Sequence, residues 1–179
     1  LRDWTNNTQK SIPIYLRKID LDVIKKTFYY LVDTSKITSG GTVAKLDFKT
    51  IDDEKINIIG QDFVPLNVKH GNNYFANGYR IDNFSYISDC SYIPKDTMKK
   101  IEGSEIIVLD ALRKGIKHKS HLTLEESIEI ILELKPKSAY FTDACHDIDH
   151  NETNDFLKII SKKSKIKMQM AFDGLSIKI

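Results

Sequence analysis

The apolar run at residues 105–109 constrains the fold more than any other part of the sequence. It reads Glu-Ile-Ile-Val-Leu, which is typical of a strand covered on both faces. Thr123 and Glu126 follow with the spacing of a capping box, and they predict the start of an amphipathic helix. Residues 139–142 then predict another strand. Strands that alternate with helices in this way indicate a layered α/β fold.

The part of the chain before residue 94 follows a different pattern. Short runs rich in β-branched and aromatic residues predict strands joined as consecutive hairpins; these runs are residues 43–50, 55–59, 63–69, 77–81 and 84–88.

The remaining segments of the chain complete the predicted elements. They predict a strand at 12–16, a helix capped by Asp20, helices at about 94–101 and 151–161, and terminal strands at 167–172 and 175–179. The whole pattern predicts an antiparallel-rich sheet that leads into strand–helix units.

Composition excludes several classes of protein. The 179 residues carry a net charge of only +2, far from the basic excess of a dedicated nucleic-acid binder. No run approaches the roughly 20 apolar residues of a membrane helix. The only cysteines, Cys90 and Cys145, cannot form a disulfide framework, so we expect a reducing, cytoplasmic location.

Polar residues that can bind metal recur where the predicted strands end. They are His70, Asp89, Asp110 and Asp143, and the last is followed by His146, Asp147, Asp149 and His150. Imidazoles mixed with carboxylates suit Zn²⁺, Mn²⁺ or iron. Spacing alone leaves two alternatives open: His70 could be a hydrogen-bonded structural residue, and the loop after Asp143 could simply cap the next helix.

Several short motifs appear in a fixed order along nearly the whole chain. They include His-Gly-Asn-Asn-Tyr from residue 70, Ser-Asp-Cys from 88, Leu-Asp-Ala-Leu-Arg from 109, Ser-His-Leu-Thr from 120 and Phe-Thr-Asp-Ala-Cys-His from 141. This pattern resembles the metallo-β-lactamase superfamily, in particular the phosphoribosyl 1,2-cyclic phosphate phosphodiesterases, which lie near tRNase Z. The resemblance implies an α/β fold, an αββα sandwich, and a hydrolytic site with two divalent ions, Zn²⁺ or Mn²⁺.

The resemblance also implies roles for individual residues. His70 matches a histidine that ligates one metal, Asp89 matches the aspartate that bridges both metals, and His121 matches the general acid near the leaving group. The last ligand departs from the pattern, because many relatives read Thr-His-x-x-His and this chain has Asp143 at the first of those histidines. We therefore expect His146 to be the ligand, with Asp143 as the alternative.

Two basic residues are candidates for binding the substrate. Arg113 follows the strand that ends in Asp110, and Lys117 belongs to a small basic patch in the next loop. Either side chain could face a phosphate group, while a solvated loop is the alternative interpretation. Both are therefore treated as predicted substrate-binding residues.

A further departure concerns the family's His-x-His-x-Asp-His motif, which this sequence does not contain. The resemblance therefore implies that residues 1–179 are the C-terminal two-thirds of one domain whose N-terminal part, with that motif, is missing. Such a piece would expose an apolar face, and pairing with a second copy as a homodimer is one expected consequence.

The leading functional hypothesis is a metal-dependent phosphodiesterase that acts on a small cyclic or nucleotide-like phosphate ester. A tRNA 3′-processing-type ribonuclease is a second hypothesis, disfavoured because no inserted basic arm is present, so nucleic acid is not the expected partner. A non-catalytic scaffold that has lost its metals is a third, supported by the missing motif and by Asp143.

Overall fold

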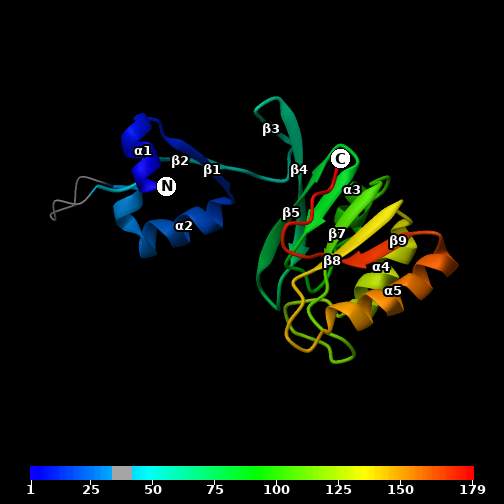
Figure 1. The fold of residues 1–179 in the computed structure, drawn as a ribbon. Helices are drawn as coiled ribbons and strands as arrows, with labels where there is room; N and C mark the ends of the chain where they lie inside the picture. Colours follow the sequence, from blue (N-terminus) through cyan, green and yellow to red (C-terminus); the bar gives the residue numbers. More distant parts are fainter. Residues whose placement is uncertain (34–41) are drawn as a thin grey trace. The chain divides into compact units, whose positions relative to one another are not determined.

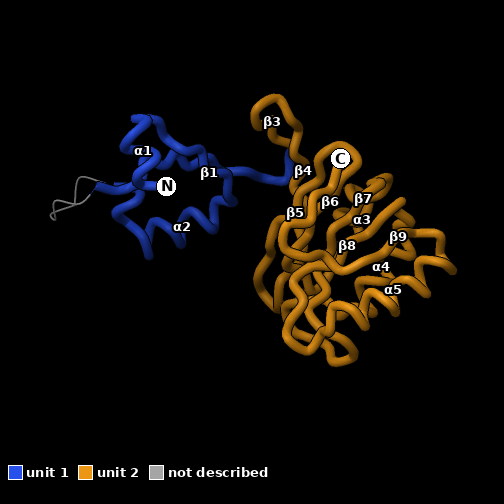
Figure 2. Tube along the Cα trace, in the orientation of Figure 1, with its two compact units in different colours: residues 1–54 blue, residues 55–179 orange. Residues whose placement is uncertain are grey.

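The computed structural model describes residues 1–33 and 42–179, which form two compact units. The first unit is Leu1–Glu54 and the second is Lys55–Ile179, shown in different colours in Figure 2. The single domain expected from the sequence stays a prediction.

The first unit is a small strand–helix–strand arrangement preceded by a helix. Its elements are α1 (Arg2–Thr8), β1 (Ile12–Leu16), α2 (Lys18–Thr27), the short 3-10 helix η1 (Tyr29–Leu31) and β2 (Leu46–Thr50). The strands β1 and β2 pair in parallel, so the prediction that the run at 43–50 begins a series of hairpins is wrong. Because α2 lies between the two strands in the chain, it provides the crossover that a parallel pair requires.

The start of α2 also differs from the sequence prediction. The helix begins at Lys18, with Arg17 as its N-cap residue, so Asp20 lies in the first turn. There Asp20 accepts a hydrogen bond from the Arg17 guanidinium at 2.7 Å. Its carboxylate still favours the helix, because negative charge is stabilised near a helix N-terminus.

The second unit is built on a seven-stranded sheet in which sequence order equals spatial order. Its strands are β3 (Ile56–Ile58), β4 (Gln61–Lys69), β5 (Phe75–Ile81), β6 (Phe84–Ile87), β7 (Ile106–Asp110), β8 (Ser138–Thr142) and β9 (Lys167–Met170). Strands β3 to β6 pair antiparallel, as predicted, and β6 to β9 pair in parallel. The sheet is therefore mixed: β6 pairs antiparallel with β5 and parallel with β7. Figure 1 shows the fold, with β7, β8 and β9 as neighbouring strands.

Three helices pack against this sheet. They are α3 (Lys95–Ile101), α4 (Leu124–Leu134) and α5 (His150–Ser164); α3 contacts β4, α4 contacts β7 and β8, and α5 contacts β9. Four consecutive residues of β7, from Ile107 to Asp110, are buried, which confirms a strand covered on both faces. Leu109, Phe141 and Ile131 are fully buried in the core between the sheet and the helices.

The capping box before α4 is confirmed. The Thr123 hydroxyl accepts from the Glu126 backbone N–H at 3.2 Å, and the Glu126 carboxylate accepts from the Thr123 backbone N–H at 3.0 Å. This pair of hydrogen bonds fixes the chain just after His121. No helix in the described ranges is long and apolar enough to cross a membrane.

The end of the chain differs from prediction. Strand β9 ends at Met170, and residues 175–179 form no strand. The Leu175 backbone N–H donates to the Phe172 carbonyl at 3.0 Å, so the Asp173-Gly174 pair makes a turn. The extended segment after a turn becomes a β-strand only when its backbone forms hydrogen bonds with a neighbouring strand. The sequence alone does not show whether such a neighbouring strand is present.

Candidate metal centre

Four strands deliver polar side chains to one edge of the sheet. His70 directly follows β4, Asp89 lies two residues after β6, Asp110 is the last residue of β7 and Asp143 directly follows β8. Strands β6, β7 and β8 are parallel, and β4 runs the same way as β6 because β5 is antiparallel to both. All four strands therefore end at the same edge, where α/β proteins place ligands.

His70 is held with one ring nitrogen free for a ligand. Its Nδ1 lies 2.8 Å from the backbone carbonyl oxygen of Ser120. A carbonyl oxygen can only accept a hydrogen bond, so Nδ1 must carry the hydrogen. The lone pair is therefore on Nε2, and a metal-binding histidine is normally oriented by this kind of hydrogen bond from its other nitrogen.

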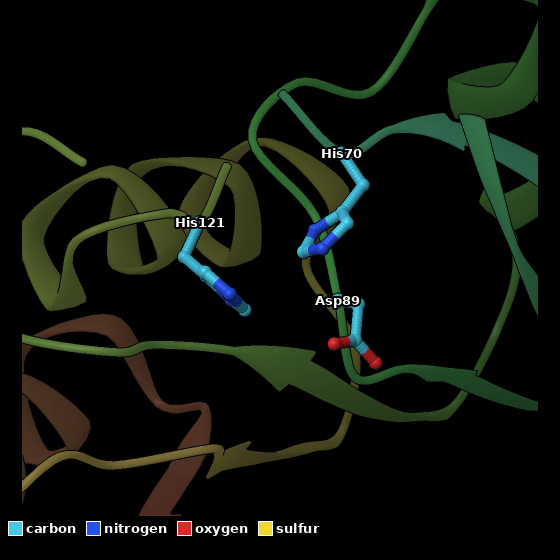
Figure 3. Close-up of side chains that lie close together, drawn as sticks. All are labelled: His70, Asp89 and His121. Carbon is cyan, nitrogen blue, oxygen red and sulfur yellow. The ribbon is translucent and has the colours of Figure 1, made fainter. Parts of the chain in front are cut away.

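His70 belongs to a group of three possible ligands. One atom each from His70, Asp89 and His121 lie within 4.8 Å of one another, and Figure 3 shows the three side chains converging. The two imidazole rings meet edge to face with centroids 4.8 Å apart. A set of two imidazoles and one exposed carboxylate fits Zn²⁺ or Mn²⁺.

His121 is oriented by a buried carboxylate. Its Nδ1 lies 2.9 Å from Oδ2 of Asp110, and the same oxygen accepts the Cys90 backbone N–H at 2.7 Å. The Asp110 side chain is fully buried, so its position is fixed by the surrounding core. The carboxylate accepts the Nδ1 hydrogen of His121, and Nε2 is the ring nitrogen left for other chemistry.

The sequence predicted Asp110 at a strand end as one of several residues able to bind metal, but it did not predict that Asp110 would orient His121. Burial raises the pKa of Asp110 to about 8; the Cys90 N–H opposes this rise, whereas the charges of Asp143 and Asp89 add to it. The sequence feature that could have identified Asp110 is its position, because it is the charged residue that ends the most apolar predicted strand. A carboxylate in such a place needs a specific partner.

The raised pKa of Asp110 predicts a pH-dependent stability. The folded value of about 8 exceeds the ordinary value of 3.8, so between these values the folded state binds more protons than the unfolded state. The free energy of unfolding should therefore fall as pH rises from about 4 to about 8. Urea unfolding in EDTA should show a flatter pH profile for Asp110→Asn. Identical slopes for both proteins would contradict this origin of the pH dependence.

The two candidates for the last ligand lie in different surroundings. The His146 side chain is 94% exposed and its Nε2 lies 3.2 Å from Asp147. Asp143 forms a second group of possible ligands with Asp110 and His121, whereas neither group found within the described residues includes His146. Metal binding by either residue stays a prediction.

The two predicted substrate-binding residues, Arg113 and Lys117, differ in the contacts that their side chains make. The Lys117 ammonium lies 2.8 Å from the Glu126 carboxylate, and that hydrogen bond raises the pKa of Lys117. Arg113 is only partly exposed, and its buried Nε forms no hydrogen bond within the part of the chain that the structure describes. Their contacts with a substrate stay predictions.

Comparison with known proteins identifies the family. Residues 1–143 match the model of the beta-lactamase superfamily domain, so the chain belongs to the metallo-β-lactamase superfamily. The expected superfamily and its α/β fold are thereby confirmed. No match was found among curated protein sequences.

Solved structures of this fold align with most of the chain. A diphosphatase of the PhnP family is 32% identical, with a TM-score of 0.79 over 95% of this chain and 59% of that chain. Zn²⁺-bound PqqB from Methylobacterium extorquens is 14% identical, with a TM-score of 0.69 over 95% and 66%. Human tRNase Z, short form, is 13% identical, with a TM-score of 0.62 over 94% and 69%. The chain thus spans about three-fifths of the diphosphatase, and the two more distant structures share its fold.

Proposed function

We propose that this protein is a metal-dependent hydrolase of phosphate esters, and that its substrate is a small cyclic or nucleotide-like phosphodiester. The observation that carries the proposal is the convergence of His70, Asp89 and His121, with both imidazoles held in defined orientations. The similarity to a diphosphatase supports phosphorus rather than carbon as the centre attacked. The tRNase Z structure is only 13% identical to this chain, so it does not favour a ribonuclease to the same degree.

The site would hold its metal through His70 and Asp89. Nε2 of His70 carries the free lone pair, and the Asp89 carboxylate is exposed at the same strand edge. Bound Zn²⁺ or Mn²⁺ would supply an activated water and would neutralise charge on the phosphoryl oxygens. The Ser88 hydroxyl donates to Asp89 Oδ2 at 2.6 Å, which orients the carboxylate and leaves Oδ1 for the metal.

His121 would act as the proton donor to the leaving oxygen. Asp110 accepts the Nδ1 hydrogen at 2.9 Å and so fixes the orientation of the ring. The opposite nitrogen, Nε2, can then present a hydrogen to an alkoxide as the bond to phosphorus breaks. Asp110 is thus a positioning residue in this proposal, and His121 is the catalytic one.

Cationic groups around the site favour an anionic substrate. Desolvation lowers the pKa of His118, and the charges of Arg113, His121 and His70 lower it further. The guanidinium of Arg113 is thus near enough to act on this site, and it would attract a phosphodiester because the two charges are opposite.

Hydrolysis of a chromogenic phosphodiester tests this proposal. The purified protein should hydrolyse bis(p-nitrophenyl) phosphate when Zn²⁺ or Mn²⁺ is supplied, and EDTA should abolish the reaction. A p-nitrophenyl carboxylate ester and a β-lactam serve as controls for carbon-centred hydrolysis. Turnover of either control in preference to the phosphodiester would contradict the proposal, and the absence of both metal binding and turnover would favour the scaffold hypothesis.

A further inference from the structure

The helical layer of the second unit contains a cavity of about 360 Å³, lined by residues of α3, of α4 and of the loops before them. We propose that this cavity binds an organic ammonium ion, with a single positive charge and an apolar body. A volume of this size suits a small molecule, because ligand pockets measure roughly 300–1,000 Å³. The cavity contains none of the residues in the two groups of possible metal ligands, so the inference does not rest on the proposed function.

The cavity exists because α3 and α4 cover strands that are not neighbours in the sheet. Helix α3 contacts β4, whereas α4 contacts β7 and β8. The space between the two helices is only partly filled by side chains. Its apolar lining comes from Tyr92, Ile93, Met98, Leu122 and Ile130. These side chains can take the apolar body of a ligand out of water.

One side of the cavity is acidic. Three glutamates of α4, Glu126, Glu129 and Glu133, line it together with Ile130. Glu126 is paired, because the Lys117 ammonium lies 2.8 Å from its carboxylate. Lys117 also feels the charge of Glu129, but neither Glu129 nor Glu133 forms a hydrogen bond or an ion pair with another residue in the described part of the chain. Two carboxylates at the cavity are therefore available to a ligand.

The positions of these two carboxylates favour a bound cation. Glu133 lies in the last turn of α4, which contains no basic residue, and negative charge is unfavourable at a helix C-terminus. Glu129 and Glu133 are four residues apart, a spacing at which like charges on a helix repel each other. An ammonium group bound between them would offset both effects.

The remaining charged residue of the lining limits the charge of the ligand. Lys95 of α3 also lines the cavity, and it forms no ion pair within the ranges that the structure describes. Glu129, Glu133 and Lys95 together leave one negative charge without a counterion. A ligand with one positive charge balances it, and a polyamine would exceed it.

Calorimetric titration with phenethylammonium tests the inference, because this ion has an aromatic body and one ammonium group. We expect saturable binding of one equivalent, with or without Zn²⁺. Phenylacetate, which has a similar body and the opposite charge, should bind at least about 10-fold more weakly. A double variant, Glu129→Gln with Glu133→Gln, should also bind phenethylammonium at least about 10-fold more weakly, the loss expected when hydrogen bonds to a charged group are removed.

Glu152→Gln is the matched control variant. It removes an exposed carboxylate from the first turn of α5 that does not line the cavity, so its affinity should equal that of the wild-type protein. Glu129 and Glu133 are exposed, and glutamine can replace them without disturbing the core; circular dichroism checks the fold. Absence of saturable binding, equal affinity for phenylacetate, or unchanged affinity in the double variant would overturn the inference. Phosphodiester hydrolysis is measured separately, and its presence or absence does not affect these outcomes.

Discussion

Replacement of His121 by alanine should lower turnover of an alkyl phosphodiester by about 10²- to 10⁴-fold, the usual contribution of a general acid. The reason is the hydrogen bond from His121 Nδ1 to Asp110 Oδ2, 2.9 Å long. It fixes the imidazole ring, so that Nε2 is the nitrogen left to donate a proton. Without that ring the proposed proton donor to the leaving oxygen is lost. Steady-state hydrolysis with saturating metal measures the loss.

The leaving group separates a proton donor from a structural residue. A p-nitrophenolate leaves without much protonation, so His121→Ala should lose far less activity on bis(p-nitrophenyl) phosphate than on an alkyl ester. His150→Ala provides the matched control, because His150 is an exposed histidine at the start of α5. Equal losses on both substrates would show that His121 supports the fold and does not donate the proton.

Replacement of Asp89 by alanine should release metal and activity together. Asp89 is the only carboxylate in the group with His70 and His121, so its loss leaves a divalent ion without an anionic ligand in that group. We expect metal affinity and turnover each to fall at least about 100-fold. Elemental analysis after dialysis and the phosphodiester assay provide the two measurements.

The control for this change is Asp96→Ala, which removes a 94%-exposed carboxylate from the first turn of α3. It should leave metal content and turnover as they are in the wild-type protein. An Asp89→Ala protein that keeps its full complement of metal would contradict the assignment of Asp89 as a ligand.

The sequence was informative where local patterns decide structure. The apolar run of β7 and the capping box of α4 identified their elements, because burial on two faces and a helix cap each leave a signature within a few residues. His70, Asp89 and Asp143 could be placed at strand ends because each follows closely on a short run of strand-forming residues. The parallel pairing of β1 with β2 could not be predicted, since it depends on contacts between segments 34 residues apart in register.

The arrangement of side chains within the site depends on contacts between segments far apart in the sequence, and no short sequence pattern predicts such contacts. Asp110 gained its importance because parallel pairing of β6 and β7 brings the Cys90 N–H to its carboxylate. The hydrogen bond from His70 to Ser120 joins residues 50 positions apart. Such contacts arise from the packing of several strands and a loop, so the residue types were predictable and their partners were not.

The measurement that tests the central claim most directly is anomalous diffraction at the zinc edge from crystals soaked in Zn²⁺. The account predicts a peak about 2.0–2.1 Å from Nε2 of His70 and about 2.0–2.2 Å from a carboxylate oxygen of Asp89. A crystal with zinc only at His146 and Asp147, or with none at this edge of the sheet, would contradict it.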